Sequence, residues 1–336
     1  MTEKKEKPIK IKKTRFGFRG ISKLSVQNFC KTWLFAIFRT LLIIGLAYVI
    51  LYPIFNMLSK AFSEDYVKSS TVVWIPKHIG LNNVKLALDY LKYGTTIWNT
   101  LSLSIIAALI QVVSSAVIGY GFARYNFKGR ELLFTLVILT IIVPPQTYLI
   151  PMYIGYRYFN FFYLGSLLHA IIPSIDGYIN LLSTNWTMWI PAIFGVGLRG
   201  GLFIYIFRQF FRGMPKDLEE AATIDGCGPF KTFVRIMAPN ALSAGLTVFL
   251  FSLVWHWNDY FVSSMMFQKV ESRPMSVMLF SQNRFTQEMA SQGGSYIDMG
   301  YILNAAVMLA IAPLLVIFAF AQKYFIESVD RVGIKG

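Results

Sequence analysis

The sequence predicts an all-α protein that crosses a membrane six times. Its 336 residues are 55% hydrophobic and 16% aromatic, and the apolar residues form runs of about 20, the length that crosses a bilayer. The formal net charge is nevertheless +15. Most of the Lys and Arg residues stand in short segments between the apolar runs, which favours membrane topology over a nucleic-acid partner.

The first 32 residues predict a basic cytoplasmic tail, because they hold ten Lys and Arg residues against Glu3 and Glu6. The end of this segment, from Ile21 to Trp33, has the composition of a helix that lies along the membrane surface. We therefore divide the chain into a tail, 1–32, and a six-span transmembrane domain, 33–336. The first apolar run, 34–58, is too long for the core of a signal peptide and is interpreted as a retained span.

An outer loop, 60–94, follows the first span, and its turn residues include Pro76 and Gly80. The second span is predicted over 95–122. At about 100° per residue, Ser104, Gln111 and Ser115 of this span share one face. We favour hydrogen bonding between helices as their role, and a polar translocation path is the alternative.

The third span, 132–156, contains Pro144, Pro145 and Pro151, so its helix is expected to be kinked or broken. The break indicates packing or, less often, the wall of a gate. The segment 157–188 is apolar but short for a span. A crossing there would move the basic residues around 208–235 to the outside, against the positive-inside rule, so we place this segment on the outer surface.

The fourth span, 189–210, has glycines that allow close helix approach and one charge, Arg199. Structural pairing of Arg199 and a role near the substrate are equally open. The fifth span, 241–260, ends with aromatic residues around His256 and Asp259, which we interpret as a polar pair at the interface. An outer loop, 261–299, the sixth span, 301–321, and a short basic tail complete the chain.

Between the fourth and fifth spans, 211–239 form a polar stretch in apolar surroundings. Asp217, Glu219 and Glu220 suit the first turn of a helix, and Gly226 suits its end. A second helix is expected from Phe230 to Ala238, which gives a helix–turn–helix on the cytoplasmic side. On physical grounds this stretch is equally suited to dock a partner or to pack on its own spans.

Several kinds of chemistry find no support in the sequence. It contains no phosphate-binding loop, and Gly226 to Thr232 has the wrong spacing for one. Three histidines spread over the chain do not form a metal or catalytic cluster, and the two cysteines do not indicate a disulfide framework. We expect a transport protein that is no enzyme, has no metal or cofactor of its own, and takes energy from a partner.

A resemblance identifies that partner. Glu220-Ala221-Ala222, then three residues, Gly226, nine residues, and Ile236-x-x-Pro239 is similar to the EAA loop of ABC importer permeases, with Ala238 where Leu is usual. The segments Gly121 to Tyr125 and Phe207 to Phe211 also resemble carbohydrate-type permeases of the maltose-importer class. The resemblance covers roughly 34–336 and implies the binding-protein-dependent ABC importer permease fold, with a cytoplasmic EAA coupling helix.

The resemblance also implies partners and functional residues. It implies a bacterial cytoplasmic-membrane permease that has both termini in the cytoplasm. This permease would assemble with a second homologous permease subunit, two copies of a cytosolic ABC ATPase that binds the ATP, and an extracellular solute-binding protein that delivers a sugar. The residues that would couple it to the ATPase are Glu219, Glu220, Ala221, Ala222, Asp225, Gly226, Ile236 and Pro239. A secondary transporter or membrane receptor without ATP coupling is the alternative.

The sequence also offers polar residues for a substrate path. They are uncharged amides or hydroxyls, or a single guanidinium, set in apolar segments: Asn99, Ser104, Gln111, Gln146, Arg199 and Asn258. Polar groups inside a membrane span are costly and so mark functional candidates. The sequence does not identify the sugar.

Overall fold

The computed structural model describes residues 23–64, 75–160, 166, 171, 177–281 and 296–333, without the side chains of 23–31, 296–298 and 324–333. In the described residues the regular structure is helical, apart from two isolated bridges that pair Ser63 with Ile79 and Phe159 with Ile179. The chain divides into two units, Met1–Asn56 and Met57–Gly336. The residues predicted as a basic tail lie outside the described part up to residue 22.

Helix α1, Lys23–Ala61, confirms a helix over the predicted first span. Its stretch Thr32–Ala61 is long and apolar enough to cross a membrane. Its side chains from Thr32 to Phe55 are mostly exposed, as expected for a helix in lipid. The expected surface helix over Ile21 to Trp33 is not a separate element, because residues from Lys23 onward continue into α1 without a break.

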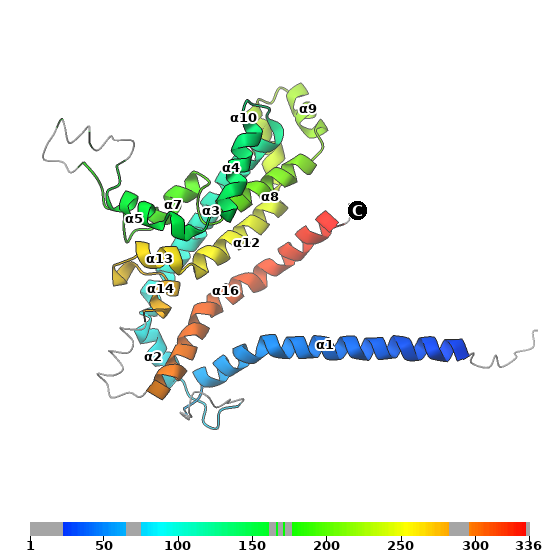
Figure 1. Ribbon diagram of the computed structural model, residues 1–336, viewed down its shortest axis with the longest axis vertical. Helices are drawn as coiled ribbons and strands as arrows, with labels where there is room; N and C mark the ends of the chain where they lie inside the picture. The colour runs from blue at the N-terminus through cyan, green and yellow to red at the C-terminus, as the bar shows by residue number, and fades with distance from the viewer. Residues whose placement is uncertain are drawn as a thin grey trace, which may run out of the picture. The chain divides into compact units, whose positions relative to one another are not determined.

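Helix α3, Tyr93–Arg124, is the centre of the second unit and confirms the predicted second span. It packs along α8, Gly200–Gly213, and α12, Leu242–Asn258, which is the helix of the predicted fifth span (Figure 1). Gly119 permits the close approach to α8, since a Cβ there would lie 2.6 Å from the Cβ of Phe207. Small residues allow such contacts between membrane helices.

The predicted third span is broken at its prolines, as expected. Helix α4, Arg130–Ile142, ends before Pro144, the 3₁₀ turn η1 covers Pro145–Thr147, and α5 runs over Leu149–Arg157. Proline removes a backbone donor, so the α-helical ladder cannot continue through this pair. The third span is therefore two helices joined by a turn.

The predicted fourth span is also broken, which the sequence analysis did not expect. Helix α7, Trp186–Ile193, and α8 are separated by a turn in which Gly195 and Arg199 have φ angles of +72° and +59°. These left-handed residues stop one helix and start the next in a new direction. The glycines at 195 and 197 thus shape a turn, whereas Gly201 fits against the carbonyl oxygen of Val137 in α4.

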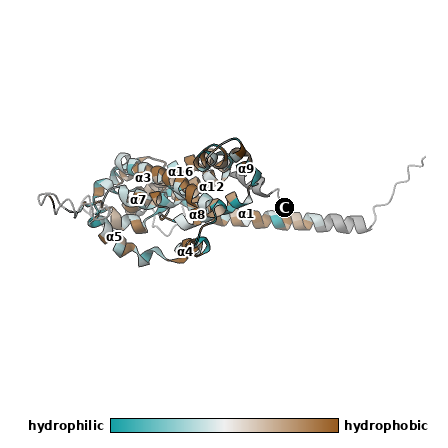
Figure 2. Cartoon of the chain, turned by 90° about the horizontal axis from the view of Figure 1, so that it is seen from above, coloured by the Kyte–Doolittle hydropathy of each residue, from teal (hydrophilic) through white to brown (hydrophobic). Residues whose placement is uncertain are grey.

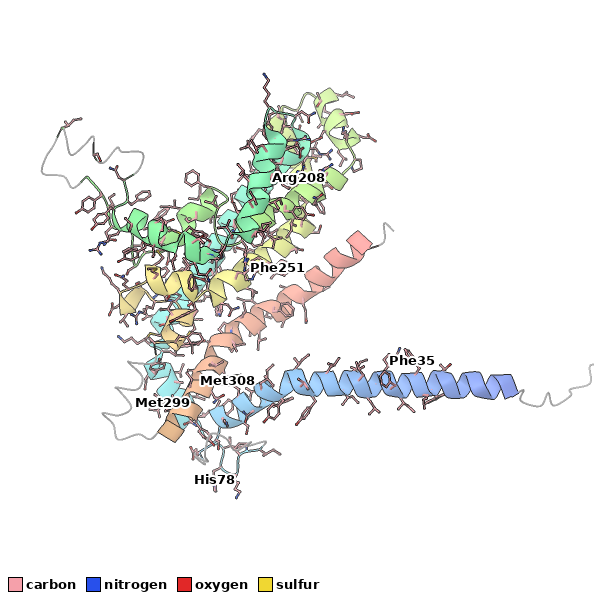
Figure 3. The ribbon with its side chains drawn as sticks, in the orientation of Figure 1. Phe35, His78, Arg208, Phe251, Met299 and Met308 are labelled. Atoms are coloured by element: carbon pink, nitrogen blue, oxygen red, sulfur yellow. The ribbon has the colours of Figure 1, made fainter. Side chains whose placement is uncertain are left out.

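Helix α16, Tyr296–Gly333, contains the predicted sixth span and continues through most of the expected basic tail. Its first half packs on α2, Asn82–Tyr90, an amphipathic helix inside the predicted outer loop 60–94. Alanines at 87, 305, 306 and 310 keep the two helices close. Figure 3 places Met299 and Met308 along this part of α16, and both contact the same core.

The second predicted loop, 261–299, likewise contains short helices in its described part. These are α13, Phe261–Met266, the 3₁₀ turn η4, Val270–Ser272, and α14, Met275–Leu279. Asp259 accepts hydrogen bonds from the backbone N–H of Val262 and Ser263 at 3.4 and 2.8 Å, so it caps α13. Its carboxylate is thus hydrogen-bonded to α13, and not to His256 as the predicted polar pair would have it.

The described residues contain three helices long and apolar enough to cross a membrane, α1, α3 and the Met299–Lys323 part of α16. A fourth crossing is counted if the bent pair 229–240 and α12 is one span. Figure 2 shows hydrophobic residues along α12 and α16 and hydrophilic ones at α9, Asp217–Ile224. The protein is thus an all-helical membrane protein, with two of the six predicted spans interrupted.

Candidate functional site

The loop between α8 and α12 has the helices that the sequence predicts. Helix α9 spans Asp217–Ile224 and has three acidic residues in its first turn, where they face the positive end of the helix dipole. Two residues after the end of α9 comes Gly226, whose φ is +75°. The backbone N–H of Gly226 donates to Thr223 at 3.0 Å and that of Cys227 to Ala222 at 2.9 Å, which is a Schellman motif.

Two apolar side chains stand on either side of this glycine and point away from the protein. Ile224 is 86% exposed and Phe230 is 80% exposed. Glu220, Ala221 and Asp225 are exposed as well. In Figure 1 this loop, with α9 and α10, lies at one end of the helices around α3. The loop therefore presents a small apolar tip with acidic neighbours.

The opposite side of α9 faces the protein. Ala222 is only 1% exposed. The Glu219 carboxylate accepts a hydrogen bond from the Tyr120 hydroxyl at 2.7 Å and lies 3.5 Å from Nε of Arg124. Both partners belong to the last turns of α3. The eight residues that the sequence grouped as coupling residues thus divide between an outer and an inner face.

The second arm of the loop is continuous helix with a wider turn inside it. Helix α10, Pro229–Thr232, leads into a π-helical turn, Phe233–Met237, and then into α11, Ala238–Asn240. Ile236 is half-buried and packs on the core of α3, α8 and α12. The arm meets α12 at an angle of 75°. Pro239 stands in the first turn of α11, just before this bend, where the missing N–H of a proline costs little.

Gln111 joins three parts of the bundle from a fully buried position in α3. Its Nε2 donates to the Leu198 carbonyl at 2.8 Å, and its Oε1 accepts from the Ser252 hydroxyl of α12 at 2.7 Å. Ser252 lies one turn before His256, whose Nδ1 is 2.8 Å from the Ser252 carbonyl oxygen. The geometry of Gln111 matches the hydrogen bonding between helices that the sequence analysis favoured.

The other members of that face of α3 are also buried. The hydroxyls of Ser104 and Ser115 have no hydrogen-bond partner among the described residues, and neither has Nε2 of His256. A buried polar atom without a partner is costly, so these positions are departures from ordinary core packing. The structure brings Ser104 and Gln111 onto one buried face, and neither is among the residues that line the cavity around Arg199.

Three more of the predicted path residues are separated from one another. Asn99 donates to the carbonyl of Glu271 at 2.7 Å and so ties η4 to α3. Asn258 donates to Val254 of its own helix at 3.0 Å. Gln146 is exposed in the turn η1 that interrupts the third span. The structure does not gather these side chains with Ser104 and Gln111.

Arg199 is the path candidate that does line a cavity. A cavity of about 650 Å³ lies between the two broken segments, α4–η1–α5 and α7–α8. Its walls are mainly apolar, and Tyr148 and Thr140 are among its few polar side chains. The Arg199 guanidinium carbon lies 5.7 Å from the centre of the Trp255 ring, a distance typical of a cation–π contact.

Arg208 is an ionic feature that the sequence analysis did not single out. It lies where α8 meets α4 (Figure 3), nearly buried, with its guanidinium carbon 3.7 Å from the centre of the Phe134 ring. Glu131 approaches it at 3.7 Å and also accepts two hydrogen bonds from Arg130, at 3.0 and 2.8 Å. In the sequence, only its place inside the Phe207 to Phe211 motif pointed to this position.

Tyr120 and Arg124 were also missed as partners of the loop, although the motif Gly121 to Tyr125 had been noted. Their residue types carry no signal of a partner about 95 positions away. Among the described residues, no group of three His, Cys, Asp or Glu could hold a metal ion. The described contacts form an exposed surface on the α9 loop and a set of links between helices.

The chain is similar to known transport proteins over most of its length. The arabinooligosaccharides transport system permease protein AraQ of Bacillus subtilis is 28% identical over 313 residues, 90% of this chain and 98% of that protein. The probable starch degradation products transport system permease protein AmyC of Thermoanaerobacterium thermosulfurigenes is 25% identical over 93% of this chain and 99% of its own length.

The fold is similar to that of a solved structure as well. A bacterial ABC transporter involved in the import of the acidic polysaccharide alginate has a chain that superposes with a TM-score of 0.66 and 19% identity, over 88% of this chain and 98% of that chain. The family described as "Binding-protein-dependent transport system inner membrane component" matches residues 112–331. Since this match covers more than half of the sequence, the chain belongs to that family and is a permease subunit of an ABC importer rather than an enzyme.

Proposed function

We propose that this permease carries oligosaccharides across the bacterial cytoplasmic membrane, as half of a pore driven by an ABC ATPase. The substrate class rests on relatives whose names specify arabinooligosaccharides, starch degradation products, and melibiose, raffinose and stachyose. The observation that carries the ATP coupling is the α9 loop, where Ile224 and Phe230 stand exposed beside the Gly226 cap.

The loop suits a partner that has an apolar groove with basic edges. Exposed large apolar side chains on a polar loop gain free energy when a partner removes them from water, by roughly 1.5–3 kcal/mol for a fully buried side chain. Glu220 and Asp225 lie beside these side chains and favour positive charge on the partner. This is the surface that we assign to the cytosolic ATPase.

We further propose that the chain crosses the membrane six times. The crossings are α1, α3, the pair α4–α5, the pair α7–α8, α12 and α16, so each broken pair counts as one span. Broken helices are tolerated in a bilayer where their free backbone groups are covered by protein or line a cavity. The cavity between the two broken pairs meets this condition.

The orientation follows the distribution of basic residues. Both termini and the α9 loop lie in the cytoplasm, with 1–32 as a tail and the segment 157–188 on the outer surface. Residues 161–165, 167–170 and 172–176 of that segment lie outside the described part. The remaining partners are a second homologous permease subunit, a second copy of the ATPase, and a solute-binding protein on the outer side.

The decisive experiment reconstitutes the chain with these partners in liposomes and measures sugar uptake with and without ATP. We expect uptake of an oligosaccharide that requires both ATP and the binding protein. Replacement of Ile224 and Phe230 by Asp should prevent the ATPase from copurifying, whereas Thr223→Ala, a change of an exposed neighbour, should not. Uptake that continues without nucleotide would identify a secondary carrier, and binding without uptake would identify a receptor.

A further inference from the structure

We infer that Glu219 does not contact the ATPase but links α9 to the end of α3, and so positions the coupling loop relative to the spans. This inference rests on the proposed function and assigns a separate role to one residue of the loop. The adjacent acid, Glu220, points outward and is left as the docking residue. Of these two neighbouring carboxylates, Glu219 would hold the loop in position and Glu220 would bind the ATPase.

The first support is the geometry of the Glu219 carboxylate, both of whose oxygens are directed to α3. The Tyr120 hydroxyl donates to Oε1 at 2.7 Å, and Nε of Arg124 lies 3.5 Å from Oε2. Arg124 also donates to the carbonyl oxygen of Met214 at 2.8 Å, just before α9 begins. The Arg124 side chain is only 7% exposed. A charge pair that is held this way is screened less by water than a surface pair.

The second support is the division of α9 into two faces. Glu219 and Ala222 are three residues apart and lie on one side of the helix. That side is turned inward, because Ala222 is buried and Glu219 is bound to α3. Glu220 and Ala221 are exposed on the other side. A partner that covers the outer side would leave the Glu219 carboxylate where it is.

The third support is the aromatic cluster that holds Tyr120. Its ring lies 5.3 Å from that of Phe211 and 5.0 Å from that of Phe233, measured between centroids. Phe211 lies in the last turn of α8, the helix that enters the loop, and Phe233 lies in the arm that leaves it. One tyrosine of α3 therefore contacts both ends of the loop and, through its hydroxyl, the helix between them.

The link continues along α3 to the bundle interior. Gln111 lies nine residues before Tyr120, about 13 Å along a helix, and bonds to α12 and to the turn that holds Arg199. A displacement of α9 that is carried into α3 would thus reach the helices around the cavity. Coupling through such a network requires a measured interaction energy, which a double-mutant cycle supplies.

The experiment uses the whole complex with Glu219→Gln, Tyr120→Phe and the double variant. Asp217→Asn is the matched control, an exposed acid two residues away on the same helix, and Glu220→Lys is the docking contrast. We measure copurification of the ATPase, ATP hydrolysis, and sugar transported per ATP hydrolysed. Thermal unfolding in detergent shows whether each variant is folded.

We expect Glu219→Gln and Tyr120→Phe to keep the ATPase bound and to lower sugar transported per ATP by about tenfold, the order of one charge-assisted hydrogen bond. The double variant should be no worse than either single one. Glu220→Lys should instead lose the ATPase. Restored coupling when Glu219→Arg is combined with Arg124→Glu would support the link further.

Loss of the ATPase in Glu219→Gln would overturn the inference, because it would make Glu219 a docking contact. The inference would also be overturned if the double variant lowered sugar transported per ATP by the product of the two single effects. An unchanged ratio of sugar to ATP in both single variants would overturn it as well. These results leave the proposed function intact. A complex of the unaltered chain that transports without nucleotide would instead overturn the proposed function and the link together.

Discussion

Gly119 of α3 lies directly against Phe207 of α8, so that a Cβ at position 119 would come within 2.6 Å of the Cβ of Phe207. The same Cβ would lie 3.1 Å from the carbonyl oxygen of Ile204. Neither neighbour is the flexible end of a side chain. The contact between the two helices therefore depends on the absence of a side chain at this position.

The first prediction is that Gly119→Ala destabilises the bundle. The helices must separate to admit the methyl group, at a cost of about 1–3 kcal/mol, typical of an overpacked core. Thermal unfolding in detergent measures the change. Gly121→Ala is the control, because nothing lies within 4 Å of its Cβ and the residue is in the same helix. An equal effect of both changes would argue against this contact.

The second prediction concerns the cap of α9. Gly226→Ala places an L-residue at a φ of +75°, which costs about 1 kcal/mol or more. The strain should distort the tip and weaken ATPase binding several-fold, as measured by copurification or titration. Gly228→Ala should have little effect, because Gly228 has a φ of −71° and open space around it. If only Gly228→Ala weakened ATPase binding, the role that we assign to the Gly226 cap would be contradicted.

The third prediction separates the two interpretations of Gln111. Gln111→Leu leaves the Leu198 carbonyl and the Ser252 hydroxyl without this partner, and such bonds in membrane bundles contribute about 0.6 kcal/mol on average. We expect lower thermal stability and an unchanged KM for the sugar. Ser252→Ala should add little to Gln111→Leu. A large change in KM with unchanged stability would favour the polar path.

The fourth prediction tests Arg199, which has a φ of +59°. Arg199→Gly removes the strain of the left-handed conformation and should stabilise the turn by about 1 kcal/mol. If the guanidinium serves transport from its place in the cavity, uptake should fall while thermal stability rises. Arg199→Lys keeps the charge but loses the planar group over Trp255, and an intermediate uptake is expected. Unchanged uptake in Arg199→Gly would leave Arg199 a structural residue.

The fifth prediction tests the orientation. Cys227 is a free thiol at the α9 loop, and it is partly exposed. In cells whose Cys30 is replaced by Ser, a thiol reagent that cannot cross the membrane should not label Cys227, whereas a permeant one should. Gln268, an exposed residue that we propose lies on the outer side, is changed to Cys as the positive control. External labelling of Cys227 would contradict six spans with a cytoplasmic loop.

Local chemistry made much of the fold predictable from the sequence. Pro144 and Pro145 cannot continue a helix, so the sequence places the break in the third span where the structure has it. Gly226 is a residue type that ends a helix, so the end of α9 was predicted as well. The long apolar runs of α1, α3 and α16 left no other secondary structure that a bilayer would accept. These features depend on neighbours within a few residues.

The missed features depend on contacts over long distances. The left-handed conformation of Arg199 could not be read from an arginine, although the glycines around it were a signal for a turn. Helix α2 was taken for a loop because its apolar face is short and is completed only by α16. The hydrogen bond between Glu219 and Tyr120 requires contact between α3 and α9. The spacing of residues in the sequence does not predict this contact.

The 75° bend between 229–240 and α12 has a mechanical consequence. Twelve helical residues make a lever about 18 Å long, with its free end at the apolar tip and its hinge near Pro239. A push of about 3 Å at the tip then turns the lever by about 10°, since the rise per residue fixes its length. The lever is nearly perpendicular to α12. Such a push would therefore rotate α12 about the hinge rather than move it along its own axis.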